Sequence, residues 1–277
     1  MIKQLCFLIL CVCVFTQLKA QQIKIVTYNI RYNNAADGEN SWPLRKGKFD
    51  TLLNNLNADI WCFQEVLNSQ LIDLKVMLPN YSFAGIGRDD GKEAGEFSPI
   101  FYNDSLFELI QLGTFWLSAT PNDTGSKGWD AAITRICTWV KLKHKLSGKV
   151  FFVFNTHFDH IGVNARENSA KLILTKMNEL TNNEPIILAG DFNSEPSDKA
   201  YKNIIKNKII RFKDSFIKQK FHCTFTGFKV NGGICKRIDF IFINKYFNVK
   251  FFEIINQNDG KNYPSDHLPV LTILNMK

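Results

Sequence analysis

The stretch EPIILAGDFN, residues 184–193, passes from an apolar run directly into polar side chains. The run Pro185–Ala189 is short and apolar, which predicts a buried β-strand. It opens into Gly190, Asp191, Phe192 and Asn193. Polar residues at one strand end carry little information, because turns favour them everywhere. The motif gains meaning only if other strands end in the same way.

The same arrangement recurs along the chain. Seven further runs rich in β-branched and aromatic residues predict strands: Ile23–Ile30, Asp59–Gln64, Ser98–Tyr102, Thr134–Leu142, Val150–Thr156, Ile238–Ile243 and Leu268–Leu274. Several of them adjoin side chains that bind metals or transfer protons, namely Asn29, Glu65, His157, His160, Asp239, Asp266 and His267. The number and the chemical type of these residues indicate an active site built at strand ends.

The predicted helices favour an α/β fold with a mixed sheet. Helical spacing of apolar residues is clearest after the start signals Ser41 and Pro43, and it returns near Ala170; the apolar positions are Phe49, Leu52, Leu53 and Leu56, then Ala170, Ile173, Leu174 and Met177. Helices separate some predicted strands, while other strands follow one another through short turns, which favours mixed sheets with helices outside. No linker or solenoid-type repeat interrupts residues 21–277, so we expect one domain.

The amino terminus, MIKQLCFLILCVCVFTQLKAQQ, has the layout of a secretory signal peptide. Lys3 precedes a short apolar stretch that ends at Phe15, and Ala20 stands before the expected cleavage site. A membrane anchor and a lipid anchor on a cysteine of this segment are the alternatives. The stretch is short for a membrane span, so we expect residues 1–20 to be removed and the domain 21–277 to be periplasmic or extracellular.

The composition excludes disordered, collagen-like and coiled-coil proteins, since 45% of the residues are hydrophobic and 22% are charged. Loss of Lys3 and Lys19 with the signal peptide lowers the formal net charge from +8 to +6. A mildly basic surface attracts polyanions and anionic lipids without choosing between them.

Four cysteines remain after the signal peptide, too few for a disulfide scaffold in a domain of this size. Their spacing fits no zinc finger. Cys62 and Cys137 lie in apolar runs and are expected in the core. Cys223 and Cys235 flank a Gly-Gly hairpin and could pair in an oxidising compartment.

Asn29, Glu65 and Asp266 offer oxygen ligands and no sulfur, which suits Mg²⁺ or Mn²⁺. A zinc site would instead use Asp191 with the three histidines His157, His160 and His267. In an extended strand, however, His157 and His160 would point to opposite faces. Asp239 and His267 form a second candidate unit, because a buried carboxylate would orient the imidazole and raise its pKa.

Six of these segments resemble the endonuclease/exonuclease/phosphatase superfamily, which includes pancreatic DNase I, exonuclease III, inositol-polyphosphate 5-phosphatases, neutral sphingomyelinases and deadenylase nucleases. They are TYNIR at 27–31, QE at 64–65, NTH at 155–157, GDFN at 190–193, RIDF at 237–240 and SDHLPV at 265–270, in the family's order. The resemblance implies a DNase I-like, four-layer α-β-β-α sandwich of two packed mixed sheets. It also implies metal-dependent hydrolysis of a phosphoester.

The resemblance also implies a role for each matched residue. Glu65 is expected as the principal metal carboxylate, with Asn29 and Asp266 completing the site. Asp191 is expected to orient or deprotonate the attacking water, with Asn193 beside it on the phosphate. His157 and His267, the latter paired with Asp239, are expected to contact the phosphate.

Further segments are similar to a bacterial subgroup described only as metal-dependent hydrolases, whose substrates do not carry over. They are DGENSW at 37–42, GRDDG at 87–91, GEFSPIFY at 95–102, FWLS at 115–118, GWDAA at 128–132 and NAREN at 164–168. The candidate substrate-binding residues near these motifs are Arg31, Arg88, Glu96, Trp129, Asp130, Arg135 and, in a supporting place, His160. Glu96 and Asp130 could bind a hydroxyl group or a second metal. The alternatives are salt bridging for the arginines, core packing for Trp116 and Trp129, and a capping or turn role for Glu96 and Asp130. Arg45 is expected on a helix surface.

The leading hypothesis is a secreted Mg²⁺- or Mn²⁺-dependent phosphodiesterase or phosphatase without a stable protein partner. Its substrate would be a nucleic acid, a phospholipid head group, or a sugar or inositol phosphate. A nuclease should show a basic strip and strong salt dependence, whereas a small-molecule enzyme should have a closed pocket walled by Arg88, Glu96 and Trp129. A non-catalytic binding module is the alternative of another class.

Overall fold

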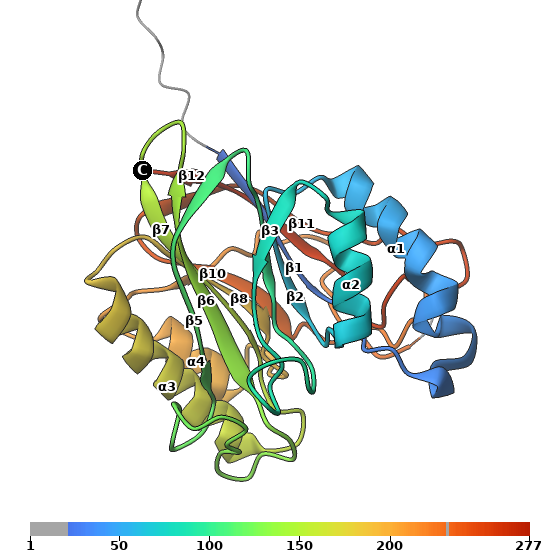
Figure 1. Ribbon diagram of the computed structural model, residues 1–277, viewed down its shortest axis with the longest axis horizontal. Coiled ribbons are helices and arrows are strands. Elements are labelled where there is room, and N and C mark those ends of the chain that lie inside the picture. The colour runs from blue at the N-terminus through green and yellow to red at the C-terminus, as the bar shows by residue number, and fades with distance from the viewer. Residues whose placement is uncertain (1–21, 231–232) are drawn as a thin grey trace, which may run out of the picture.

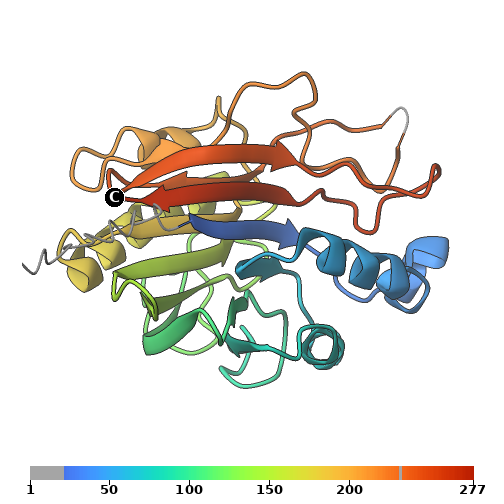
Figure 2. The same cartoon turned by 90° about the horizontal axis from the view of Figure 1, so that it is seen from above.

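The computed structural model describes residues 22–230 and 233–277 as two six-stranded sheets packed face to face, with helices outside (Figures 1 and 2). The four-layer α-β-β-α sandwich is therefore confirmed. The expected signal peptide, residues 1–20, lies outside the described residues. In the part of the chain that the structure covers, no helix is long and apolar enough to cross a membrane.

Each sheet contains one parallel strand pair among antiparallel neighbours, so both sheets are mixed. The first sheet has the order β11-β12-β1-β2-β4-β3, with β11 Phe247–Ile254, β12 Val270–Met276, β1 Gln22–Asn29, β2 Ile60–Gln64, β4 Ile100–Asn103 and β3 Tyr81–Ala84. The second has the order β5-β6-β7-β8-β10-β9, with β5 Phe107–Trp116, β6 Ile136–His144, β7 Val150–His157, β8 Ile186–Asp191, β10 Asp239–Ile243 and β9 Lys213–Asp214.

The helices cover the outer faces of the sheets. Helices α1 (Trp42–Leu56) and α2 (Asn68–Met77) lie over the first sheet, and α3 (Val163–Thr181) and α4 (Lys199–Ile205) lie over the second (Figure 1). A short 3-10 turn, η1 (Ala35–Asn40), precedes α1. Ser41 occupies the N-cap position of α1 without a capping hydrogen bond from its side chain, and proline stands in the first turn, as the sequence predicts.

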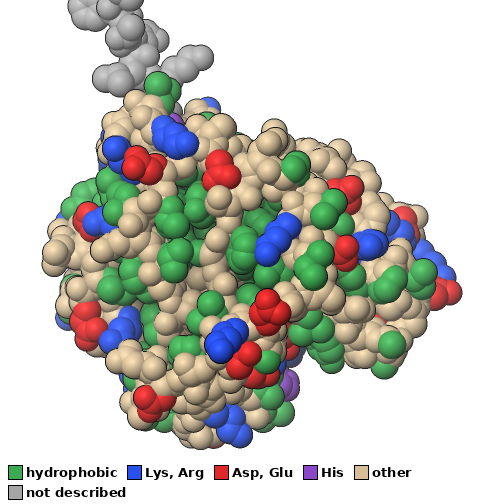
Figure 3. Space-filling model, in the orientation of Figure 1, with side chains coloured by type: hydrophobic (Ala, Val, Ile, Leu, Met, Phe, Trp, Pro, Cys, Tyr) green, Lys and Arg blue, Asp and Glu red, His purple; other side chains and the backbone are tan. Residues whose placement is uncertain are grey.

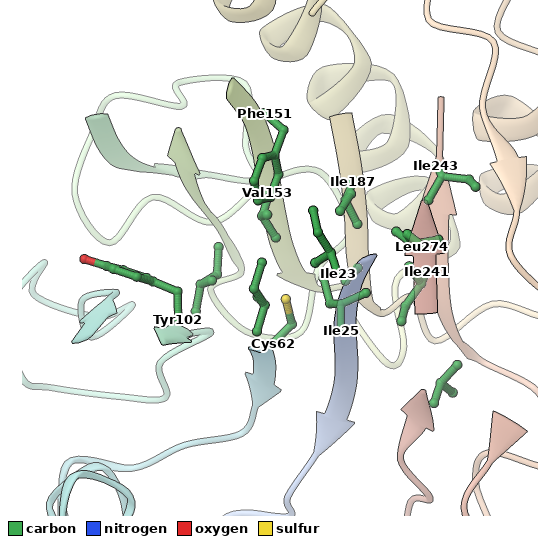
Figure 4. Packing of buried hydrophobic residues seen from close by; sticks show 14 of the residues in the cluster. Ile23, Ile25, Cys62, Tyr102, Phe151, Val153, Ile187, Ile241, Ile243 and Leu274 are labelled. Atoms are coloured by element: carbon green, nitrogen blue, oxygen red, sulfur yellow. The ribbon is translucent and has the colours of Figure 1, made fainter. Parts of the chain in front are cut away.

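Three apolar layers hold these four structural layers together. The central layer lies between the sheets and includes Ile23, Cys62, Val153 and Leu274 (Figure 4). The other two lie between each sheet and its own helices. Strand β8 is buried along its whole length because it is covered on both faces. Cys62 and Cys137 are buried and unpaired, as expected.

The parallel pairs explain why the site residues meet. In β1-α1-β2 and in β7-α3-β8, a helix returns the chain so that both strands end at the same edge of the sheet. The antiparallel strands β10 and β12 begin at that edge, so residues just before them, or first in them, join the group. Asp239, the first residue of β10, pairs in register with Asp191, the last of β8.

All eight strands that the sequence predicts exist and occupy interior positions of the sheets. The four that it missed, β3, β5, β9 and β11, are the four sheet edges. Edge strands carry polar residues and irregularities, such as the bulge beyond Leu109 in β5, so their apolar signal is weak. The short helices α2 and α4 were also missed.

Candidate active site

A pocket of about 500 Å³ opens where strand ends of both sheets meet. Eleven of its fourteen lining residues are among those that the sequence singles out. They are Arg31, Glu65, Arg88, Glu96, Arg135, His157, His160, Asp191, Asn193, Asp266 and His267; Tyr32, Ile133 and Phe225, which the sequence did not single out, complete the lining.

Asp191 lies at the centre of the polar contacts in this pocket. Its Oδ2 atom accepts a hydrogen bond from Asn29 Nδ2 at 3.0 Å and lies 3.4 Å from His157 Nε2 and 3.6 Å from His267 Nε2. Its Oδ1 atom accepts the backbone N–H of Asn193 at 2.9 Å. Burial, with the neighbouring carboxylate of Asp239, raises the pKa of Asp191.

Gly190 allows β8 to approach β7 closely at this point. Its φ is +149°, and a Cβ atom there would lie 2.1 Å from the carbonyl oxygen of Thr156. A side chain at this position would push the two parallel strands apart. The glycine of the GDFN motif therefore keeps Asp191 beside His157.

Two imidazoles face Asp191 in different electrostatic surroundings. His267 Nδ1 lies 2.9 Å from Asp239 Oδ2, which leaves Nε2 facing Asp191. Burial alone would lower the pKa of His267, but the carboxylates of Asp239 and Asp191 outweigh it and raise the pKa well above its usual value. Burial lowers the pKa of His157, and Arg135 lowers it further. The surroundings therefore shift the pKa values of the two imidazoles in opposite directions.

Asn193 connects the second imidazole to the same group. Its side-chain amide nitrogen lies 3.1 Å from His157 Nε2 and donates to the carbonyl oxygen of Phe158 at 3.0 Å. The backbone of Asn193 is left-handed, with φ +44°, a conformation that asparagine tolerates better than most residues. The GDFN motif thus supplies both a carboxylate and an amide to one pocket.

Glu65 and Asp266 fit a divalent cation. Both line the pocket, and neither forms an ion pair with a lysine or arginine among residues 22–230 and 233–277. Burial raises the pKa of Asp266, and the negative charge of Glu65 adds to this effect. Two close carboxylates without a balancing cation are suited to Mg²⁺ or Mn²⁺, which prefer oxygen ligands.

Asn29 occupies a different place from the one expected for a metal ligand. Its side-chain nitrogen donates to Glu65 Oε1 and to Asp191 Oδ2, both at 3.0 Å, and its oxygen accepts the N–H of Arg31. In this orientation Asn29 bridges two acidic side chains and does not line the pocket. Glu65 has a left-handed backbone, with φ +60°, and the N–H of Tyr32 also donates to its carboxylate.

A second group of metal-binding side chains lies alongside. Asp191, Asp239 and His267 present ligand atoms within 4.8 Å of one another, and this group could also hold a metal ion. The expectation that His157 and His160 point to opposite faces of one strand is wrong. Strand β7 ends at His157, so strand alternation does not apply to His160, and both histidines line the pocket.

Arg88, Glu96 and Arg135 form one wall of the pocket, which we call the Arg-Glu-Arg wall. Arg88 and Glu96 lie on the loop between β3 and β4, and Arg135 precedes β6. Arg88 Nη1 donates to Glu96 Oε2 at 2.6 Å, and Arg135 Nη1 lies 4.0 Å from the same oxygen. Arg135 Nη2 lies 3.2 Å from His160 Nδ1, so His160 contacts this wall.

Trp129 and Asp130, which the sequence predicts as substrate contacts, lie outside the pocket lining. The wall therefore lacks Trp129, which was expected in it. Trp129 is 41% exposed on a turn with a left-handed backbone, φ +52°. Asp130 accepts the backbone N–H groups of Asn164 and Ala165 in the first turn of α3, which is the capping role. Arg31 lines the pocket, but its guanidinium is bound to Asp37 through two hydrogen bonds of 2.9 Å.

Phe225 lines the pocket, although no pattern in the sequence marks it as a site residue. Its ring packs on that of His267 with centroids 4.8 Å apart. It belongs to the segment 223–227, which also bonds to the turn that carries Asp266 and His267 through Thr226 and Gly227. The feature of the sequence that could have drawn attention to this segment is the cysteine pair Cys223 and Cys235, which begins at the segment and can be read as a disulfide-closed loop.

Cys223 and Cys235 form a disulfide in the structure, with Cα atoms 5.0 Å apart. We predict that replacing both cysteines with serine lowers the free energy of unfolding by about 3 kcal/mol, because a loop of this length is no longer closed in the unfolded chain. Urea denaturation with and without a thiol reductant measures the effect. The wild-type midpoint should fall in the reductant, and that of the double variant should not move; equal midpoints for all four samples would contradict the prediction.

Comparison with known proteins agrees with this geometry. The sequence model of the Endonuclease/Exonuclease/phosphatase family matches residues 26–267, a span that contains every pocket residue. The chain belongs to this family. Members of the family hydrolyse phosphoester bonds, so the protein is a phosphoester hydrolase of the endonuclease/exonuclease/phosphatase type.

Similar proteins come from bacteria and a virus. A family protein from Bacteroides thetaiotaomicron of known structure is 37% identical, with a TM-score of 0.88 over 93% of this chain and 98% of that one. The mannosyl-6-phosphatase of the same species is 38% identical, with a TM-score of 0.85 over 91% and 99%. An uncharacterized protein of Acanthamoeba polyphaga mimivirus is 32% identical over 84% of this chain and 91% of its own length.

Proposed function

We propose that this family member is an exported Mg²⁺- or Mn²⁺-dependent phosphatase that releases phosphate from a small polar alcohol. The observation that carries the proposal is that one pocket collects Glu65, Asp266, Asp191 and His267 together with the Arg-Glu-Arg wall. Its volume, about 500 Å³, is that of a small-molecule site. The similarity to a mannosyl-6-phosphatase along nearly the whole of both chains supports the same class of substrate.

The side chains of the pocket would divide the reaction between them. Glu65 and Asp266 would hold the divalent cation, which supplies positive charge to the phosphate oxygens when bound. Asp191 would orient the attacking water and accept its proton. His267, held by Asp239, and Asn193 would donate hydrogen bonds to the phosphate as its negative charge moves toward the leaving oxygen.

A nuclease is less well supported. On the face of the molecule shown in Figure 3, lysines and arginines are interspersed with acidic side chains and, among the described residues visible there, form no continuous basic strip. A protein that tracks a nucleic acid backbone needs such a strip. Trp129, which could stack on a base, lies outside the pocket.

The proposed export rests on the signal-peptide pattern of residues 1–20, and the Cys223–Cys235 disulfide supports it because disulfides persist in oxidising compartments. Mass spectrometry of the protein isolated from its native cell tests this point. We expect a mature chain that begins near Gln21, whereas a full-length chain in the cytoplasm would rule out export.

The function is tested with a panel of phosphoesters, with and without a chelator. We predict that a hexose 6-phosphate and mononitrophenyl phosphate are hydrolysed faster than bis-nitrophenyl phosphate, single-stranded RNA or sphingomyelin. The chelator should abolish turnover, and Mg²⁺ or Mn²⁺ should restore it. Preferential cleavage of RNA would establish the nuclease alternative, and a folded protein that binds neither ion and cleaves nothing would establish a binding module.

A further inference from the structure

One side chain, that of His157, separates the Arg-Glu-Arg wall from Asp191. His157 stands between the two regions, since its Nε2 atom lies 3.4 Å from Asp191 Oδ2 and its Nδ1 atom lies 3.9 Å from Glu96 Oε2. A phosphate bound at Asp191 and His267 would therefore place the group attached to it within reach of Glu96. The wall is in position to contact the alcohol part of a substrate.

The side chains of the wall are largely buried, and hydrogen bonds hold the loop that carries two of them. The side chains of Arg88, Glu96 and Arg135 are 12%, 14% and 4% exposed. The loop that carries Arg88 and Glu96 is closed by paired backbone bonds, among them Arg88 N–H to the carbonyl of Glu96 at 3.2 Å. Trp116 fixes it from behind by donating its indole N–H to the Arg88 carbonyl at 2.7 Å. A ligand would meet preorganised groups here.

Several polar atoms of the wall and its neighbour His157 lack hydrogen-bond partners. Arg88 Nε, Arg135 Nε and Arg135 Nη1 are buried without a hydrogen-bond acceptor, and His157 Nδ1 is buried without a partner as well. Glu96 Oε1 receives no hydrogen bond from any described residue. Leaving buried polar groups unpaired costs about 1–3 kcal/mol each. The wall therefore offers both donors and an acceptor to a ligand.

The charges of the wall favour a neutral ligand. Two arginines face Glu96, and each has a second carboxylate nearby: Asp89 lies 3.8 Å from Arg88 Nε, and Asp159 lies 3.6 Å from Arg135 Nε, so the wall has no excess of positive charge. A second phosphate here would be repelled by the carboxylate of Glu96. A hydroxyl group, by contrast, can donate to Glu96 and accept from an arginine at the same time.

Aromatic groups are not available for stacking at this wall. Of the described residues that line the pocket, Tyr32 and Phe225 carry aromatic rings apart from the histidines. Phe225 packs on His267, and the Tyr32 ring lies under the guanidinium of Arg31 at 4.4 Å. A nucleobase would find no free ring beside Glu96.

We propose that Glu96, flanked by Arg88 and Arg135, binds hydroxyl groups of the alcohol part of the substrate, which makes the preferred substrates phosphomonoesters of polyhydroxylated molecules such as sugars. This inference rests on the proposed phosphatase function. It adds the residues that set the substrate class and assigns them no part in the attack on phosphorus.

The test compares two substrates that share a phosphate and differ in hydroxyl groups. We measure kcat/KM for a hexose 6-phosphate and for mononitrophenyl phosphate with the wild type and with Glu96→Gln, which keeps the size and removes the charge. The ratio of the two values should fall about tenfold to 100-fold in Glu96→Gln, mainly through a higher KM for the sugar phosphate. The inhibition constant of inorganic phosphate should differ much less between the wild type and Glu96→Gln than this ratio does.

Glu93→Gln is the matched control, because Glu93 is an exposed glutamate of the same loop and lies outside the pocket. It should keep the wild-type ratio. If Glu96→Gln fails to fold, Arg88→Lys must lower the same ratio, since lysine keeps the charge and loses the fork of donors.

The outcomes separate the two proposals. A wild type that hydrolyses neither monoester would remove the phosphatase function and this inference with it. A wild type that hydrolyses both, with the same ratio in every folded wall variant, would leave the phosphatase function standing and overturn the role of the wall.

Discussion

Replacement of Glu65 by glutamine or of His267 by alanine is expected to lower kcat/KM for phosphomonoesters by about 100-fold to 1,000-fold. Glu65→Gln removes one of the two carboxylates that would hold the cation, so the cation should bind more weakly. His267→Ala removes the imidazole that Asp239 orients at 2.9 Å, and with it a donor to the phosphate. Steady-state kinetics with mononitrophenyl phosphate measures both losses.

The metal dependence should distinguish the two variants. High Mn²⁺ should restore part of the activity of Glu65→Gln, because mass action compensates for weaker binding. It should restore none in His267→Ala, whose missing group is not a ligand of that cation. Glu93→Gln serves as the control and should stay within about twofold of wild type, as expected for an exposed side chain. Full activity of both variants would show that the reaction takes place elsewhere.

Replacement of Arg45 by methionine is expected to destabilise the fold by about 3–5 kcal/mol. Arg45 is 2% exposed, and its guanidinium donates to four backbone carbonyls, those of Ile30, Arg31, Asn40 and Pro264. It therefore ties the loop after β1 to the turn before Asp266, two segments more than 200 residues apart in the sequence. Methionine fills a similar volume and leaves the carbonyls without these donors.

Urea denaturation measures the change, with Lys46→Met as the matched control. Lys46 is the next residue on α1, and its ion pair with Asp73 at 3.3 Å is partly exposed, so its loss should cost less than about 1 kcal/mol. Arg45→Lys should fall between the wild type and Arg45→Met, because an ammonium group cannot reach all four carbonyls. Equal stability of Arg45→Met and Lys46→Met would show that the carbonyl contacts contribute little.

Arg45 also shows how a sequence prediction fails. It was expected on a helix surface because it is charged, yet it lies three residues after Trp42 and four before Phe49, on the buried side of α1. The helical spacing predicts that Arg45 lies on the same side as Trp42 and Phe49, but its charge favoured the exposed side. Charged residues are rarely buried unless paired, and here the partners are carbonyls that no sequence pattern reveals.

The orientation of Asn29 was equally beyond the sequence. Its position at the end of β1 was predicted, but its amide could face a cation or bridge two carboxylates. The choice depends on Arg31 N–H, Glu65 and Asp191, which come from three separate segments. Trp129 and Asp130 were misplaced for a related reason, because the loop before β6 has no periodicity that fixes where its side chains point.

By itself, the sequence determined the interior of the sandwich and the order of the reacting residues. Interior strands are buried on both faces, so they appear as apolar runs, and the polar residues at their ends are conspicuous for that reason. Only the packing of the two sheets decided the edge strands, the meeting of Arg135 with Arg88 and Glu96 in one wall, the anchoring by Arg45 and the place of Phe225. These features depend on contacts between distant segments, whose energies arise when the sheets pack and leave no local pattern in the chain.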